Sequence, residues 1–286
     1  MGLNRRRVVQ LGTAAAMGTM VPRFAMGATQ QNDAFEAQFA ETLAGLKAAF
    51  AGLGFSEAQP LSIATGNADY NGGLRHDFDQ DQLPTNAFII QPLARVADVD
   101  EKARPDVLPL FHEVGCHPGE TVSGRDTTEL MMQVLTQDFG LDPARIAFVS
   151  VPQANDMRAV LDDLNMPFVE KVLLRDEAEA LAARDASGFF FPDPMGEDYL
   201  VTMGVYYRIG DTDEPAPASY PPSSNWTEIG EIIIGGKVAP LGISIGAERL
   251  TYAQTGQFPT WDQRLAALFA LAAQEGSEPD GLATFR

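Results

Sequence analysis

The stretch "GISIGAERLTYAQTG" (residues 242–256) predicts a strand that runs directly into a helix. Residues 242–246 alternate small and β-branched side chains, a pattern that favours a strand. From Ala247 onward the residues favour a helix, and Gly256 is a typical helix end. Arg249 therefore lies at the start of a helix, immediately after a strand.

Strands and helices on either side of this junction are predicted from the same kinds of pattern. The strands cluster before and after helices without strict alternation, which indicates an α+β fold with a largely antiparallel sheet flanked by helices. The predicted helices span 33–53, 127–139, 155–164, 176–184 and 261–275. The predicted strands span 87–96, 107–116, 146–151, 169–175, 189–191, 199–209 and 225–236.

The N-terminal 28 residues have the layout of an export signal. Residues 4–28 combine a basic start, a modest apolar run and a small-residue end, and Arg5 and Arg6 fit the twin-arginine pattern. We therefore predict a twin-arginine signal peptide over residues 1–28 and a single domain over residues 29–286, placed in a bacterial periplasm. A short basic amphipathic tail is the alternative. No later segment is long and apolar enough to span a membrane.

The charge of the chain is strongly acidic. Residues 1–28 carry four of the 20 basic residues and none of the 39 acidic ones, so the mature chain has 16 bases against 39 acids, a net charge of −23. Such a surface repels phosphate backbones, so nucleic acid is not an expected partner. The single cysteine excludes an intramolecular disulfide.

Five segments resemble, in order, the catalytic core of class II aminoacyl-tRNA synthetases. "IIQPLARVADVD" (89–100) and "RPDVLPLFHEVGC" (104–116) resemble motif 2 and the strand before it, and residues 242–256 resemble motif 3. Residues 124–151 and "NWTEIGEIIIGG" (225–236) resemble the segments between these motifs. The resemblance covers roughly residues 35–260 and is closest to alanyl enzymes and to bacterial glycyl α-subunits. It implies a mainly antiparallel sheet flanked by helices, and a homodimer of the kind that class II cores commonly form.

The resemblance also implies which residues would bind a nucleotide. Arg249 matches the motif 3 arginine that holds the ATP tail, and Glu113 matches the residue near the adenine. The motif 2 arginine corresponds to Arg104 or Arg95, although neither has the expected spacing. Arginine suits such a site because it stays charged and binds phosphate through two donors. The alternative for Arg249 is an ion pair with Glu248 or another surface acid.

The substrate side of the implied pocket differs from the family. Glu228 and Glu231 lie three apart, so on a regular strand only one of them would face the pocket with its magnesium and substrate amine. The family's ammonium-binding acid corresponds to Gly242, and the first glycine of motif 3 is replaced by Ser244. These differences put the ancestral amino-acid pocket in question.

The stretch "FHEVGCHPG" (111–119) contains two of the three histidines and the only cysteine. A helical zinc site needs two histidines four apart, whereas four residues after His112 the chain has Cys116. On a strand His112 and Cys116 share one face while Glu113 points to the other. We expect no metal here. Cys116 with His112 as a nucleophile pair is the remaining catalytic alternative.

The functional expectation is an exported relative of a class II synthetase core that charges no tRNA and in which ATP-dependent amino-acid activation is altered or lost. ATP and Mg²⁺ are the cofactors if the nucleotide site survives, and the ligand is a small molecule such as an amino acid or a derivative. The alternative is a periplasmic module that binds a small molecule or a protein with the same fold and catalyses nothing. A third is hydrolysis or transfer on an amino-acid derivative. The sequence does not decide whether the chain is an enzyme. If it is one, the resemblance implies a ligase.

Overall fold

The computed structural model describes residues 28–64, 86–95, 108–117, 123–150, 155–164, 168–170, 190–192, 199–210, 214, 225–233, 242–279 and 281–285. The helices are α1 (Ala28–Gly52), α2 (Gly124–Met132), α3 (Asn155–Asp163), α5 (Ala247–Thr255) and α6 (Trp261–Glu275). A π-helical segment (Gln133–Asp138) continues α2, and 3₁₀ turns span Pro143–Arg145 and Leu282–Phe285. The strands are β1 (Ser56–Glu57), β2 (Ala87–Ala94), β3 (Leu110–His117), β4 (Ile146–Ser150), β5 (Phe168–Glu170), β6 (Phe190–Pro192), β7 (Tyr199–Arg208), β8 (Trp226–Ile233) and β9 (Gly242–Gly246).

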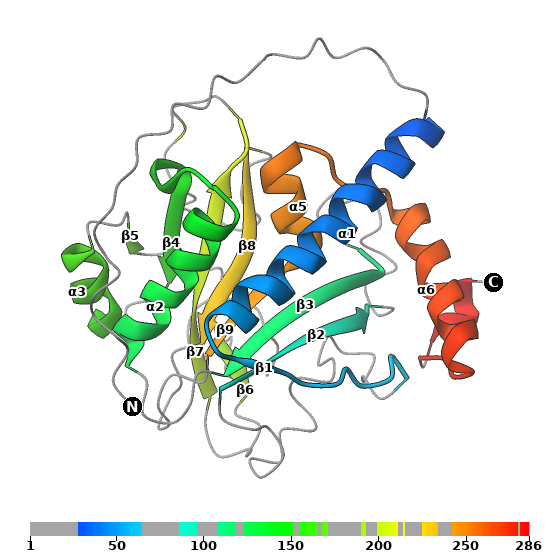
Figure 1. The fold of residues 1–286 in the computed structure, drawn as a ribbon, viewed down its shortest axis with the longest axis horizontal. Helices are drawn as coiled ribbons and strands as arrows, with labels where there is room; N and C mark the ends of the chain where they lie inside the picture. The colour runs from blue at the N-terminus through cyan, green and yellow to red at the C-terminus, as the bar shows by residue number, and fades with distance from the viewer. Residues whose placement is uncertain are drawn as a thin grey trace.

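The described strands form a sheet in the order β1-β2-β3-β9-β8-β7-β4-β5, and β6 pairs with β7 beside this path. The pairs from β2 through to β4 are antiparallel, and only the edge pairs β1–β2 and β4–β5 are parallel. The centre of the sheet is thus built from segments far apart in sequence, with β9 between β3 and β8 (Figure 1). The predicted α+β fold with a mainly antiparallel sheet is confirmed.

One face of the sheet carries the hydrophobic core. Helix α1 crosses this face diagonally, with α2 and α5 beside it, while α6 lies beyond the β2–β3 edge (Figure 1). Helical spacing places an apolar stripe of α1 against the sheet, and its buried members are Phe35, Phe39, Leu46, Ala49 and Phe50. Alternate residues of the strands meet this stripe, among them Val114, Ile243 and Ile245. The other residues of β3 and β9 are therefore available to the opposite face.

Local signals fix where the helices begin and end. Helix α6 begins after a capping box in which Thr260 and Gln263 bond each other's backbone N–H groups, and ends at Gly276 in the left-handed conformation. A cap at Asp126 would fit the α2 sequence, but the structure has the cap at Ser123, with Asp126 as its capping-box partner. The serine hydroxyl accepts from the backbone N–H of Asp126, so the helix starts three residues earlier.

The strand 199–209 and the helix 261–275 are confirmed, as are the strands 146–151 and 225–236 to within a few residues. The proposed signal peptide, apart from Ala28, and the predicted helix over 176–184 lie outside the described residues. The described helices include none with the length and hydropathy that a membrane span requires.

Candidate functional site

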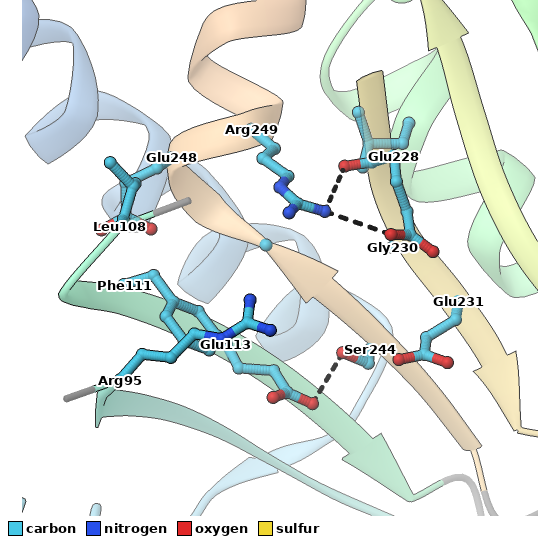
Figure 2. A pocket seen from close by; sticks show the side chains of 12 residues that line it. Arg95, Leu108, Phe111, Glu113, Glu228, Gly230, Glu231, Ser244, Glu248 and Arg249 are labelled. Carbon is cyan, nitrogen blue, oxygen red and sulfur yellow. Dashed lines mark hydrogen bonds and ion pairs between the residues drawn. The ribbon is translucent and has the colours of Figure 1, made fainter. Parts of the chain in front are cut away.

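A pocket opens on the face of the sheet opposite the core helices, above β3, β9 and β8 and beside the start of α5 (Figure 2). The hollow spans about 570 Å³, a volume that includes the part open to solvent. Six of the sequence-predicted residues line it, contributed by five separate segments: Arg95, Glu113, Glu228, Glu231, Ser244 and Arg249. Its wall also includes Leu108, Phe111, Ile229, Gly230, Gly246 and Glu248.

Arg249 reaches into the pocket from the first turn of α5. Its Nη1 donates to the carboxylate of Glu228 at 3.2 Å and to the backbone carbonyl of Glu228 at 3.3 Å (Figure 2). The two side chains are 24% and 26% exposed, so the pair is screened from most solvent yet open to the pocket. An arginine in the first helical turn is opposed by the helix dipole, and Glu228 supplies the negative charge that compensates it.

The expectation that only one of Glu228 and Glu231 could face the pocket is wrong. Both line it. The pairing of β8 with β7 shifts between Val205 and Tyr206, which pair with Gly230 and Glu228 respectively. This leaves Ile229 as an extra residue on β8. Such a β-bulge resets the alternation of side chains along a strand, and so it brings two glutamates three residues apart to the same face.

Gly230 allows this bulged strand to lie close to β9. A Cβ atom at Gly230 would clash with the backbone carbonyl oxygen of Ser244 on the neighbouring strand. Gly230 is paired with Ile245, and Glu231 with Ser244. The glycine therefore sets the spacing of the two strands that form the floor of the pocket.

A row of polar groups crosses that floor from β3 to β8. The hydroxyl of Ser244 donates to Glu113 Oε1 at 2.7 Å, and Glu231 lies beside Ser244 in the strand register (Figure 2). Arg95 follows β2, is held by a backbone bond from its N–H to the Pro109 carbonyl at 2.8 Å, and points toward Glu113 (Figure 2). The pocket therefore offers both cationic and anionic groups to a ligand.

Of the two remaining predicted site residues, Gly242 is absent from the described pocket wall and Arg104 is not described. Gly242 begins β9 with a φ of 143°, a conformation that side chains other than glycine rarely adopt. An acid there, as the family resemblance would place it, is disfavoured by the backbone itself. Arg104 lies outside the described residues, which leaves Arg95 as the described candidate for the motif 2 arginine.

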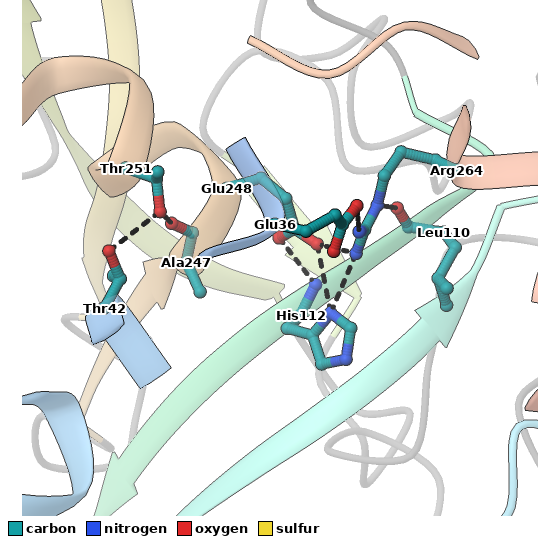
Figure 3. Close-up of polar contacts among 8 residues, drawn as sticks. All are labelled: Glu36, Thr42, Leu110, His112, Ala247, Glu248, Thr251 and Arg264. Carbon is teal, nitrogen blue, oxygen red and sulfur yellow. Dashed lines mark hydrogen bonds and ion pairs between the residues drawn. The ribbon is translucent and has the colours of Figure 1, made fainter. Parts of the chain in front are cut away.

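Glu248 of α5 also belongs to the pocket wall. Its carboxylate, however, lies in a buried cluster with His112 and Arg264 behind β3 (Figure 3). Its carboxylate accepts from the backbone N–H of His112 at 2.8 Å and lies 3.0 Å from His112 Nδ1. Arg264 of α6 forms an ion pair with the same carboxylate and donates to the Leu110 carbonyl at 3.2 Å. The surface pairing of Arg249 with Glu248, considered from the sequence, is therefore not what forms.

Charge and burial oppose each other at Glu248, whose side chain is only 1% exposed. Burial by itself raises the pKa of Glu248, but hydrogen bonds from His112 and the charges of His112 and Arg264 outweigh it. The pKa of Glu248 is thereby held below its ordinary value. Arg264 also lies 4.9 Å from the centre of the Phe39 ring. The cluster ties α5, β3 and α6 together.

His112 and Cys116 occupy the core face of β3, as the strand alternation predicts. The thiol of Cys116 is buried, and burial raises its pKa to about 12. Because the thiolate is the nucleophile, a thiol with this pKa is unreactive at neutral pH. Cys116 with His112 is therefore wrong as a catalytic pair. Among the described residues, no three His, Cys, Asp or Glu side chains are grouped as a metal site would need.

Arg264 and the buried position of the Glu248 carboxylate were not predicted from the sequence. A signal for Arg264 exists: it lies in register with Leu268 and Ala272, the buried stripe of α6. A charged residue on an apolar stripe indicates a buried partner. The partner itself could not be named, because Glu248 is acidic like many surface residues of this chain.

No protein-family model matches the sequence, and no curated protein sequence matches it. Among solved structures, the chain is similar to apo histidyl-tRNA synthetase from S. aureus, with 12% sequence identity and a TM-score of 0.44. The similarity covers 92% of this chain and 82% of the synthetase. At this level of similarity the comparison supports no argument about the site. The fold and the site described above are derived from the geometry of this chain alone.

Proposed function

We propose that the mature chain binds a small molecule in the pocket beside α5, and that it is a class II synthetase-type core in which amino-acid activation is altered or lost. The observation that carries this proposal is the assembly of Arg95, Glu113, Glu228, Glu231, Ser244 and Arg249 around one hollow. These residues correspond to site positions of the class II cores that the sequence resembles. Convergence from five segments is what a binding site requires.

Amino-acid activation would ask this pocket to hold ATP with its phosphates near arginine while a carboxylate attacks the α-phosphate and pyrophosphate leaves. In this proposal Arg249 and Arg95 would bind phosphate, Glu113 would lie near the adenine, and Glu228 or Glu231 would bind Mg²⁺ or an amine. These are the residues that would hold ATP and Mg²⁺ if the nucleotide site survives. A closer relation to alanyl and glycyl enzymes stays a prediction.

Two contacts favour altered activity. Glu228 already engages the guanidinium of Arg249, and Ser244 already engages the carboxylate of Glu113. Gly242 provides no acid for a substrate ammonium group, and its backbone conformation disfavours one. The second candidate, a module that binds a small molecule without activating it, is favoured by these same contacts. Transfer of an amino acid to tRNA is not part of either candidate, because the chain is strongly acidic.

A thermal-shift titration of residues 29–286 tests the proposal. ATP with magnesium, and separately a panel of amino acids, is added to the wild type, to Arg249→Ala and to Arg125→Ala. Arg125 is an exposed arginine of α2 paired with Glu129, so its loss changes the net charge equally away from the pocket. A melting temperature raised by ATP in the wild type and in Arg125→Ala, but not in Arg249→Ala, supports a nucleotide site, and pyrophosphate exchange then tests activation.

A response to an amino acid or derivative without a response to ATP favours the binding module. A response to neither class of ligand contradicts the proposal.

Export is part of the same proposal and has its own test: fractionation of cells expressing the full chain and an Arg5→Lys, Arg6→Lys variant. Periplasmic wild type with retained variant supports the twin-arginine route, while equal cytoplasmic retention of both contradicts it. A homodimer stays a prediction, open to sedimentation analysis.

A further inference from the structure

The pair of Glu228 and Arg249 bears on which ligands the pocket can accept. Apart from Glu248, whose carboxylate is bonded in the buried cluster, the described wall contains the carboxylates of Glu113, Glu228 and Glu231 beside two arginines. One of those carboxylates is bonded to the arginine best placed for an anion. A ligand that offers only negative charge must therefore compete with a residue of the protein.

We infer that Glu228 is a specificity-determining residue that restricts the pocket to ligands bringing positive charge together with their anionic group. The inference rests on the proposed function, namely that this pocket binds a small molecule. The ligand class is a zwitterion or an anion complexed with a divalent cation. A bare anion binds less tightly than either.

The physical reason lies in the partial burial of the pair. Glu228 and Arg249 are about three-quarters buried, with side-chain exposures of 26% and 24%. An anion that takes the guanidinium leaves the Glu228 carboxylate beside it, poorly solvated and close to the new negative charge. A ligand with its own cation compensates both effects, because the anionic group takes Arg249 and the cation takes Glu228.

The contact from Arg249 to the backbone carbonyl of Glu228 makes this inference testable by one substitution. That contact, at 3.3 Å, does not depend on the carboxylate. Glu228→Gln keeps the size of the side chain and the carbonyl that holds Arg249, and removes only the competing negative charge. The guanidinium keeps its bond to the carbonyl, and the Glu228 carboxylate no longer competes with a bare anion for it.

The experiment is calorimetric titration with inorganic pyrophosphate, once with EDTA and once with excess Mg²⁺. In EDTA, Glu228→Gln is expected to bind pyrophosphate roughly fivefold or more tightly than the wild type, the change that loss of such a competing ion pair allows. Magnesium is expected to strengthen binding to the wild type and to strengthen binding to Glu228→Gln by a smaller factor. The double variant Glu228→Gln, Arg249→Ala is expected to lose the gain.

Two variants with the same change in charge serve as controls. Glu231→Gln removes an acid from the same pocket, and Glu129→Gln removes one from exposed α2. An equal gain in either control means general electrostatics and overturns the inference. A gain that persists without Arg249, or no detectable binding to Glu228→Gln, also overturns it. If the wild type responds to ATP or to an amino acid in the thermal-shift titration while Glu228→Gln shows no gain for pyrophosphate in EDTA, the proposed function stands and the inference fails.

Discussion

Two consecutive residues of α5, Glu248 and Arg249, build two very different ion pairs. Successive residues of a helix point about 100° apart, so one side chain enters the cluster behind β3 and the other enters the pocket in front of it. The pair of Glu248 with Arg264 is 1% and 2% exposed, whereas the pair of Arg249 with Glu228 is 24% and 26% exposed. The difference in burial separates a structural role from a binding role.

The buried cluster can support the pocket from behind. His112 and Glu113 are neighbours on β3 and point to opposite faces, and Glu248 and Arg249 are neighbours on α5. The bond from the His112 backbone to Glu248 therefore joins the two elements that present Glu113 and Arg249 to the pocket. Breaking the buried pair is expected to cost stability, and breaking the open pair is expected to cost binding.

Arg264→Ala should produce the largest effect. It leaves Glu248 charged and buried without its arginine partner, a loss for which about 3–5 kcal/mol of the free energy of unfolding is typical. Urea unfolding monitored by circular dichroism measures it. Arg125→Ala, which removes an exposed arginine of equal charge, should cost far less, because exposed ion pairs contribute little to stability. Similar losses in the two variants would contradict the structural role of the buried pair.

Gly230→Ala should lower the free energy of unfolding, although Gly230 lies on the pocket face of the sheet. The added methyl group would clash with the Ser244 carbonyl, so β8 and β9 must separate. Overpacking of this kind costs about 1–3 kcal/mol, measured by the same unfolding experiment. Gly140→Ala tests a different glycine, whose Cβ would meet open space but whose φ of 67° is left-handed. If Gly230→Ala were neutral, the close approach of the two strands would be contradicted.

Much of the fold could be predicted from the sequence because its signals are local. The start of α5 after β9, the alternation along β3 and the extent of α6 all follow from the spacing of apolar residues and from glycine. The sheet order could not be predicted in this way, because β9 pairs with β3, a strand more than a hundred residues earlier in the sequence.

The site was predicted in its residue types and missed in its geometry. Regular strand alternation would place the side chains of Glu228 and Glu231 on opposite faces of the sheet. The β-bulge at Ile229 places them on the same face, and no local sequence pattern predicts this bulge. The partner of Arg249 was likewise open, because an acidic chain offers many acids. Pairing of charges depends on tertiary positions that neither spacing nor composition encodes.

The pH dependence of the free energy of unfolding should distinguish the buried cluster around Glu248 from the pocket. The pKa of Glu248 is lower in the folded state than in the unfolded state. Its stabilising contribution is therefore fully present above the unfolded pKa and is lost as pH falls through the folded pKa. The difference in unfolding free energy between wild type and Glu248→Gln should narrow as pH falls below about 4.5. Unfolding in urea from pH 7 down to pH 3 measures this. A difference that stays constant or widens would contradict the lowered pKa.

Arg249→Ala should have the smallest effect on stability and a complete effect on nucleotide binding. Its loss removes one partly open ion pair, so we expect the free energy of unfolding to fall by about 1 kcal/mol or less, against the 3–5 kcal/mol typical of a buried pair. The same variant should abolish any thermal shift caused by ATP with magnesium, because no other arginine reaches the Glu228 side of the described pocket wall. Arg249→Lys keeps the charge but lacks the planar fork of donors, and should recover the stability more fully than the binding. If Arg249→Ala destabilised the protein as much as Arg264→Ala, the Arg249 pair would be structural as well, and the division of roles between the two faces of β3 would be wrong.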